Sequence, residues 1–305
     1  MLGFGLSSRP AFTTTPALPD SNTAPTLDNN VRGAEDFFVE SLEAWRKAQK
    51  LDKMVLCGHS MGGYLSVAYS ERYPSRVDRL VLLSPVGVPE FSQKEYDERM
   101  ANISWKFKTL LSTLRGAWRM GLTPMSVLRS LPEKRGKALV DGYVHNRLKA
   151  LESVEERNAL ADYFYNIGVM PGSGEYCLHS LLKPGAFAFK PLRHRIPKLE
   201  VEHVHFIYGQ HDWMDLGGGM KVQEEVEELR KNGGKLPNID VRVVMKAGHL
   251  LMLENSDETN SVLTNIISGK KDKVIRTEEM RRTEGGTYKY QQQEAGRGKA
   301  ESNQV

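Results

Sequence analysis

The stretch MVLCGHSMGG, residues 54–63, decides how the rest of this sequence is interpreted. It opens with the apolar run Met54 to Cys57, which is typical of a buried strand. Turn-forming residues follow, and the pattern from Tyr64 to Tyr73 then predicts a helix. The stretch therefore predicts a strand, a sharp turn that carries Ser60, and a helix.

A serine with a glycine two residues before it and another two residues after it, between a strand and a helix, is the pattern of a nucleophile elbow in α/β-hydrolases. We expect the turn to hold Ser60 in a strained backbone conformation, and side chains at Gly58 and Gly62 to collide with the neighbouring strand and helix. Such a turn lifts the Ser60 hydroxyl above the sheet. The amide of Met61, at the helix start, is then expected to serve as an oxyanion donor.

The composition is that of an ordinary globular protein. The 305 residues are 40% hydrophobic and 26% charged, and they can form one substantial core plus an insertion. A net charge of +4 gives no reason to expect nucleic-acid binding. The two cysteines, Cys57 in a predicted core strand and Cys177 far away, suit a reducing compartment. Because the sequence has no run of about 18 apolar residues, we expect any membrane contact to be peripheral. The N-terminus resembles neither a secretory leader nor an Arg-rich presequence.

Strand and helix patterns alternate along the chain except in one long segment. Buried strands are predicted at Val77–Ser84, His203–Tyr208 and Ile239–Met245, and this βαβ rhythm predicts a parallel sheet flanked by helices. We expect a surface loop over residues 11–30 and helices over residues 31–49, 219–231 and 255–267. The expected units are residues 1–90 and 198–268 as the two parts of the core, residues 91–197 as a helical cap, and residues 269–305 as a disordered polar tail.

The first part of the cap is basic and amphipathic. Residues 91–150 hold twelve Lys and Arg against five Asp and Glu, a local charge of +7. Ile103, Phe107, Leu110, Leu114 and Trp118 form an apolar stripe at helical spacing, with Lys108, Arg115 and Arg119 opposite. One interpretation is a helix whose basic residues bind anionic lipid head groups. The other is a cap helix whose basic face is simply solvated.

An acid and a base follow Ser60 in the order that this fold requires. Asp212 lies in a loop directly after a predicted strand, three residues past Gly209, and His249 follows the last predicted strand. His249 is expected to take the proton of the Ser60 hydroxyl, and the aspartate to orient and stabilise the imidazolium. Asp215 competes for the role of the acid because it lies in the same loop. The remaining histidines show no metal-ligand spacing, and His59 is expected to pack within the elbow.

Five segments together carry a family resemblance, namely GHSMGGYL (58–65), YPSRV (73–77), LLSPVGVP (82–89), YGQHDWM (208–214) and GH (248–249). They resemble one α/β-hydrolase branch over about residues 1–268. This branch contains the animal lipid-droplet lipase activator, an N-acyl phospholipid hydrolase and the fungal mitochondrial cardiolipin-specific deacylase, which is the nearest fit. The resemblance implies a lipid substrate and the catalytic residues Ser60, Asp212 and His249.

The chain departs from that branch at three points. The His-X4-Asp motif of the family, linked to lysophospholipid acyltransferase activity, is here His249-X4-Glu254. The animal activator carries Asn at the nucleophile position, whereas this chain has Ser60. Finally, the segment GFGLSSRP, residues 3–10, resembles one that follows the fourth strand of these hydrolases. On this resemblance the chain starts in mid-fold and lacks the His-Gly loop of the second oxyanion donor, which predicts a weak enzyme; the alternative is a smaller fold that starts at Met1.

The sequence therefore predicts a serine acyl-ester hydrolase that acts on phospholipids, cardiolipin among them, at a peripheral membrane surface. The alternatives are a lysophospholipid acyltransferase and a non-catalytic lipid-binding regulator. No metal, cofactor or nucleic-acid partner is expected, and the oligomeric state stays open. The resemblance implies a mitochondrial location, with the cytoplasm or a lipid droplet as alternatives.

Overall fold

The computed structural model of the chain describes residues 1–12, 24–93, 104–148, 150–233, 236–269, 280–282 and 288–290. Four parallel strands form the central sheet in the order β1-β2-β5-β6. Their bounds are Met54–His59 for β1, Val77–Leu83 for β2, His203–Gly209 for β5 and Asn238–Val244 for β6. The parallel sheet that the βαβ rhythm predicted is thus confirmed.

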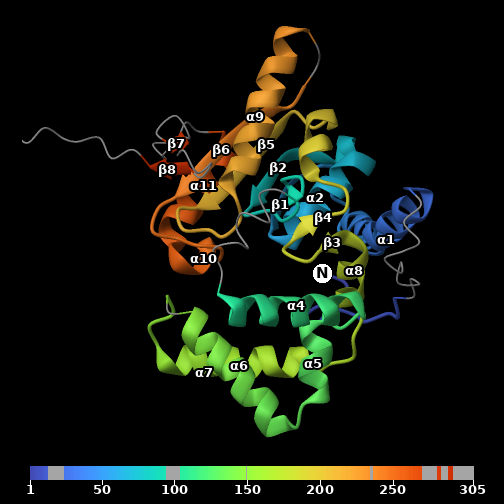
Figure 1. Cartoon of the computed structure of the whole chain (residues 1–305). Helices are drawn as coiled ribbons and strands as arrows, with labels where there is room; N and C mark the ends of the chain where they lie inside the picture. The colour runs from blue at the N-terminus through green and yellow to red at the C-terminus, as the bar shows by residue number, and fades with distance from the viewer. Residues whose placement is uncertain are drawn as a thin grey trace, which may run out of the picture.

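Alternate residues of the strands enter two different cores, as the two-residue period of a strand requires. On β2, Leu80 and Leu82 belong to the larger core, whereas Val81 and Leu83 belong to the smaller one. The larger core is covered by α1 (Ala24–Ala48), α2 (Met61–Arg72) and α9 (Leu216–Lys231). The smaller core is covered by α10 (Leu251–Glu254) and α11 (Ser256–Ser268) on the other side of the sheet, as Figure 1 shows.

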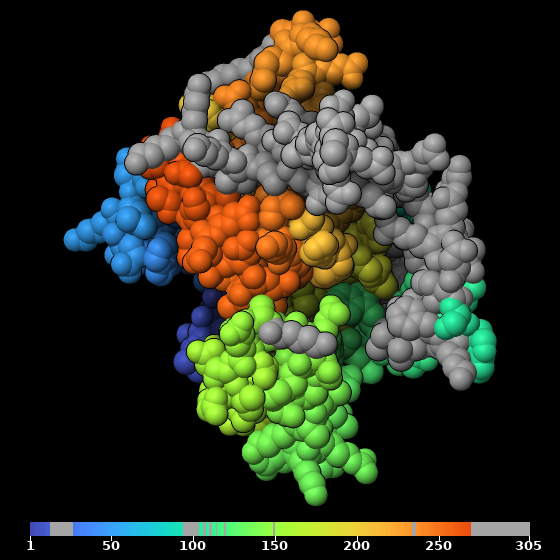
Figure 2. All heavy atoms as spheres, turned by 90° about the vertical axis from the view of Figure 1, so that its left-hand side faces the viewer, coloured from blue at the N-terminus to red at the C-terminus, as the bar shows by residue number. Residues whose placement is uncertain are grey.

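The long segment between β2 and β5 contains the cap. Its helices are α4 (Trp105–Arg119), α5 (Pro124–Ser130), α6 (Glu133–Arg147) and α7 (Val154–Gly168). They form a lobe of their own below the core in Figures 1 and 2. The chain then returns through η2 (Gly174–Cys177), α8 (Leu178–Leu181), the hairpin β3 (Leu182–Lys183) and β4 (Phe187–Ala188), η3 (Leu192–His194) and η4 (Ile196–Lys198). The sequence did not predict this hairpin, because two-residue strands leave no alternating pattern.

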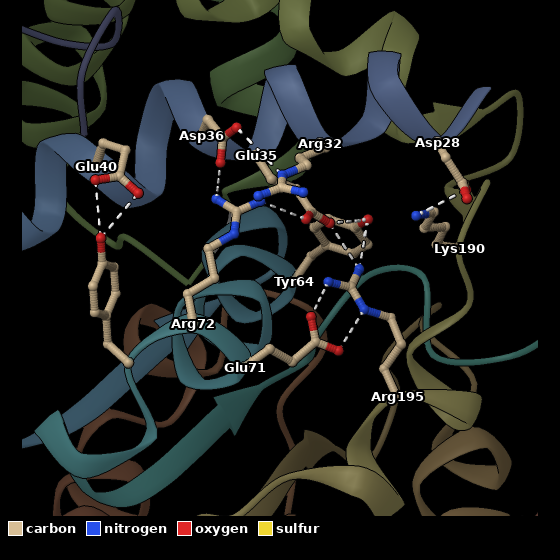
Figure 3. A network of polar contacts seen from close by, with 11 residues as sticks. Asp28, Arg32, Glu35, Asp36, Glu40, Tyr64, Glu71, Arg72, Lys190 and Arg195 are labelled. Carbon is tan, nitrogen blue, oxygen red and sulfur yellow. Dashed lines mark hydrogen bonds and ion pairs between the residues drawn. The ribbon is translucent and has the colours of Figure 1, made fainter. Parts of the chain in front are cut away.

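A polar network joins this returning segment to α1 and α2 (Figure 3). Arg195 donates to Glu35 Oε1 over 2.8 Å and forms a two-pronged ion pair with Glu71. Tyr64, four residues after Ser60, also donates to Glu35 Oε1, over 2.8 Å. Arg72 completes the network by pairing with Glu35 and Asp36. The elbow helix α2 is therefore tied to α1 and to the end of the cap segment by hydrogen bonds and charge pairs, and the pair of Arg195 with Glu35 at their centre is largely buried.

The N-terminal segment is fixed against the cap. The Arg9 guanidinium donates to the carbonyl oxygens of Gly3 and Gly5 in its own segment, and to those of Ile167 and Pro171 at the end of α7. Arg9 therefore holds the two glycines of the GFGLSSRP segment beside the last turn of α7.

Three expectations from the sequence need correction. The expected loop over residues 11–30 ends early, because α1 already begins at Ala24; residues 13–23 lie outside the described residues. Cys57 is exposed rather than in the core, because within the described sheet β1 pairs with β2 alone. Six residues of the predicted disordered tail form a two-stranded antiparallel sheet, β7 (Met280–Arg282) and β8 (Tyr288–Tyr290), and Gly269 is the C-cap of α11; the other residues of that tail lie outside the described residues.

Candidate active site

Ser60 occupies the turn between β1 and α2 in a strained conformation. Its φ of 55° and ψ of −117° place it in a region that residues with a side chain rarely adopt. Hydrogen bonds keep the turn in place: the Ser60 amide donates to Leu83 O over 2.9 Å, and its carbonyl accepts from Gly63 and Val86. The predicted backbone strain at Ser60 is therefore confirmed.

The structure confirms the expected close contact at Gly58 but not the one expected at Gly62. A Cβ at Gly58 would lie 2.3 Å from the carbonyl oxygen of Gly62, so only glycine fits at position 58. A Cβ at Gly62 would meet nothing within 4 Å, and the prediction for that position is wrong. The second close approach is at Gly63, where a Cβ would lie 2.8 Å from Pro85 Cβ. The helix thus packs on the β2 loop through Gly63, whereas Gly62 faces open space.

Ser60, His249 and Asp212 form one hydrogen-bonded array. His249 Nε2 lies 3.1 Å from Ser60 Oγ, and His249 Nδ1 lies 3.1 Å from Asp212 Oδ1. Because Asp212 is an acceptor when ionised, Nδ1 carries the proton and Nε2 is left as the acceptor for the serine hydroxyl. The structure therefore brings the three residues together in the order that general-base activation of a serine requires.

The environment of Asp212 favours its ionised form. Its side chain is only 2% exposed, and burial alone would raise the pKa of the carboxyl group. Hydrogen bonds from His249 and from the Met214 amide, at 2.9 Å, outweigh that effect, so the pKa of Asp212 lies below its ordinary value. A negative charge is thereby fixed next to the imidazole on which positive charge would develop.

Asp215, the alternative acid, has a different role. It is the N-cap residue of α9, and its Oδ1 accepts from the Gly217 amide over 2.9 Å. A carboxylate at this position is a common helix cap. The structure thus places Asp212 beside His249 and uses Asp215 to start a helix.

Met61 opens α2, so its N–H group belongs to the first turn, where helix amides have no partner within the helix. The neighbouring Ser60 amide is already engaged with Leu83 O. The role of the Met61 amide as an oxyanion donor stays a prediction.

Two aromatic residues that the sequence did not assign to the site lie against the His249 ring. The His59 ring centroid is 4.8 Å away, and His59 Nε2 donates to the carbonyl oxygen of His249 over 2.8 Å. The Trp213 ring centroid is 5.1 Å away, and 59% of this residue is exposed. In the sequence, their positions next to Ser60 and next to Asp212 were the features that could have assigned His59 and Trp213 to the site. His249 is therefore flanked by one half-buried and one exposed ring.

The predicted head-group residues lie on α4. Lys108 is exposed and Arg115 is half-buried, whereas the structure describes Arg119 only in its backbone. Of the apolar stripe, Ile103 lies outside the described residues, and the side chains of Phe107, Leu110 and Leu114 do as well. Trp118 packs on the larger core and donates from its indole nitrogen to Leu182 O over 3.3 Å. This end of the stripe thus faces the protein rather than the solvent.

Within the described part of the chain, no cluster of three or more His, Cys, Asp or Glu side chains could hold a metal ion. In the same part, no helix combines the length and the apolar character needed to cross a bilayer.

Comparison with known proteins agrees with the observed fold. A family model for the α/β hydrolase fold matches residues 1–256. A 1-acylglycerol-3-phosphate O-acyltransferase of Arabidopsis thaliana is 33% identical over 264 residues, covering 83% of this chain and 55% of the relative. The human 1-acylglycerol-3-phosphate O-acyltransferase ABHD5 is 31% identical over 267 residues, covering 87% of this chain and 68% of the relative. The human (lyso)-N-acylphosphatidylethanolamine lipase is 32% identical over 224 residues, covering 73% of this chain and 59% of the relative.

The chain thus spans between 55% and 68% of the length of these three relatives. Among solved structures, a 2-hydroxy-6-oxo-6-phenylhexa-2,4-dienoate hydrolase from Rhodococcus sp. strain RHA1 superposes with a TM-score of 0.54. That likeness covers 88% of this chain and 77% of the other at 15% identity, and it shows the shared fold alone. The chain belongs to the α/β-hydrolase fold family, in the branch that includes lipid lipases and acylglycerol-phosphate acyltransferases.

Proposed function

We propose that this protein is a serine hydrolase that cleaves acyl esters of phospholipids. The observation that carries the proposal is the continuous array from Ser60 Oγ through His249 to Asp212 Oδ1, in which each hydrogen bond of the His249 ring is 3.1 Å long. The names of the relatives, a (lyso)-N-acylphosphatidylethanolamine lipase and 1-acylglycerol-3-phosphate O-acyltransferases, support a phospholipid as the acyl donor.

The reaction follows from the placement of these groups. His249 Nε2 removes the hydroxyl proton as Ser60 Oγ attacks the acyl carbonyl carbon, and the carbonyl oxygen becomes an oxyanion that the Met61 amide can stabilise. The C–O bond to the lysolipid then breaks, and the leaving oxygen takes the proton from His249. A water molecule, deprotonated by His249, attacks the acyl-serine and releases the fatty acid and Ser60.

Acyl transfer to a lysophospholipid is the related alternative. Its first half is identical, and in the second half a lysolipid hydroxyl takes the place of water. The relatives named as acyltransferases favour this alternative. A non-catalytic lipid-binding regulator is a further alternative, and the array around Ser60 favours the enzyme over it.

The test compares the wild-type protein with Ser60→Ala on mixed vesicles that contain phosphatidylethanolamine, phosphatidylcholine and cardiolipin. Products are identified by mass spectrometry, with and without added lysophosphatidic acid. We expect the wild-type protein to release fatty acid and lysolipid, and Ser60→Ala to lose this activity by on the order of 10⁶-fold. A phospholipid product in place of free fatty acid would assign acyl transfer, and cleavage by Ser60→Ala at the wild-type rate would refute the proposal. Hydrolysis restricted to cardiolipin would support the resemblance to the mitochondrial deacylase.

We also propose that the cap binds anionic membrane surfaces through Lys108, Arg115 and Arg119. The local charge of +7 and Trp105, which is 72% exposed, support binding at this part of the cap, whereas the inward packing of Trp118 favours a solvated basic face.

Replacing Lys108, Arg115 and Arg119 by Gln is expected to weaken binding to anionic vesicles by about 3 kcal/mol, at about 1 kcal/mol each, with a clear salt dependence. The matched control replaces Lys50, Lys221 and Lys231, which lie outside the cap. Equal losses in both variants, or binding to neutral vesicles without a salt effect, would favour the solvated face. The expected mitochondrial location can be tested by cell fractionation.

A further inference from the structure

The backbone on both sides of His249 is held by side chains that the catalytic array does not use. The carboxylate of Glu254 accepts two amide hydrogen bonds, from Gly248 N to Oε2 over 2.8 Å and from Leu250 N to Oε1 over 3.1 Å. We propose that Glu254, together with His59, is a positioning residue that fixes the backbone from which the His249 imidazole reaches Ser60. This inference rests on the proposed function of Ser60 and His249.

Two peptide groups around His249 are anchored at both ends, one directly after it and one a residue before it. In the peptide that joins His249 to Leu250, the carbonyl accepts from His59 Nε2 over 2.8 Å and the N–H donates to Glu254. In the peptide that joins Ala247 to Gly248, the carbonyl accepts from the His211 amide over 2.8 Å and the N–H donates to Glu254. These contacts hold the backbone before and after His249 and so limit the positions that its ring can reach.

The same loop also contacts the loop of the triad acid. A Cβ at Gly209, three residues before Asp212, would lie 2.2 Å from the carbonyl oxygen of Gly248. The residue after the histidine is held from the cap side, because Leu250 packs against the apolar cluster of Val144, Leu148 and Ala161 in α6 and α7. The loop is therefore located by the sheet, by the cap and by Glu254.

Glu254, five residues after His249, can affect catalysis by holding the backbone, without taking part in the chemistry. Both carboxylate oxygens are occupied by backbone amides, and Glu254 is the last residue of α10. The turn between Gly248 and α10 sets the position of its carboxylate, since the Leu253 and Glu254 amides donate back to Leu250 O. We therefore assign Glu254 a positioning role rather than the role of a proton carrier.

The experiment uses Glu254→Gln, which keeps the shape of the side chain but places an NH₂ group against one of the amide donors. Because displacement of a catalytic group by about 1 Å can cost on the order of 10²-fold, and Glu254 is exposed, we expect kcat to fall about 10-fold to 10²-fold. We expect KM to stay within about two-fold, since the group acts on the chemical step. Glu254→Asp keeps both acceptor oxygens but shortens the side chain by one methylene group, so it should lose less kcat than Glu254→Gln without retaining the full value.

Glu258→Gln is the matched control. Glu258 also accepts a backbone amide of the loop after β6, from Met245 over 3.1 Å, but at the end away from His249. This variant should lower stability and leave kcat unchanged. A loss of kcat equal to that of Glu254→Gln would overturn the positioning role.

A spectroscopic measurement separates this inference from the proposed function. The downfield proton resonance of the hydrogen bond from His249 Nδ1 to Asp212 can be recorded by NMR in a Ser60→Ala background, which needs no turnover. We expect Glu254→Gln to broaden or remove this resonance and Glu258→Gln to preserve it. An unchanged resonance in Glu254→Gln would overturn the positioning role, whether or not kcat falls.

If Glu254→Gln does not fold, Glu254→Asp takes its place, and an unaltered resonance together with full kcat in that variant would count against the inference. Activity that survives Ser60→Ala would refute the proposed function alone.

Discussion

The imidazole of His59 lies against the imidazole of His249, with 4.8 Å between the ring centroids and an angle of 47° between the planes. His59 Nε2 also donates to the His249 carbonyl oxygen over 2.8 Å. Burial lowers the pKa of His59 from its ordinary 6.5, and a charge on the nearby His249 lowers it further. A neutral His59 therefore supports the backbone of the catalytic base without placing a second positive charge beside it.

The neutrality of His59 predicts a pH effect on stability. The unfolded chain binds a proton at His59 below pH 6.5, whereas the folded chain binds it only at lower pH. The neutral His59 therefore stabilises the folded state in full above pH 6.5, and this stabilisation is lost as the pH falls. His59→Asn keeps a donor for the His249 carbonyl but cannot titrate. Unfolding midpoints measured between about pH 5 and pH 8 should show a weaker acid decline for this variant. Identical pH profiles for the two proteins would contradict the prediction.

Asp212→Asn should lower kcat by up to about 10⁴-fold, because an amide leaves the imidazole in the wrong tautomer. Asp215→Ala should instead cost about 1 kcal/mol of stability, the usual value of a lost N-cap, with little change in kcat. Steady-state kinetics and denaturant unfolding on both variants check the two roles. A larger kinetic loss in Asp215→Ala would transfer the role of the acid to Asp215.

Alanine substitutions at Gly62 and Gly63 should have opposite effects. Gly62→Ala meets open space within α2 and should stabilise the protein by about 0.5–1 kcal/mol, the helical preference of Ala over Gly. Gly63→Ala drives a methyl group to 2.8 Å from Pro85 Cβ and should destabilise it by about 1–3 kcal/mol. Thermal unfolding of the pair is the measurement, and equal midpoints would show that α2 can shift to accept the methyl group.

Arg195→Leu should be strongly destabilising. Its side chain is 12% exposed and its partner Glu35 is 6% exposed, so the substitution leaves a buried carboxylate without its main cation. Removing one partner of a buried pair costs about 3–5 kcal/mol, and the lower end applies here because Arg72 and Tyr64 still contact Glu35. The control is Arg193→Leu, whose pair with Glu225 is about one-third exposed and should be worth less than about 1 kcal/mol. Denaturant unfolding that ranks the two variants equally would disprove the role of the network.

The sequence alone predicted the strand, turn and helix around Ser60, the parallel sheet and the positions of His249 and Asp212. These features depend on local patterns, because apolar periodicity and turn residues act within a few positions of each other. The strain at Ser60 was predictable for the same reason, since a strand that turns directly into a helix leaves few backbone conformations open.

Other features were decided by tertiary structure, because they depend on distances between segments far apart in the chain. Asp212 and Asp215 follow the same strand, and only the position of the loop after β6 places one of them 3.1 Å from His249 Nδ1 while the other caps α9. The sequence pattern singled out Gly62, whereas the approach of Pro85 places the close contact at Gly63. The anchoring of His249 by Glu254 and His59 joins β1, α10 and the loop after β6. No short stretch of sequence can specify which amides a carboxylate will meet, because packing of the whole sheet and cap brings them together.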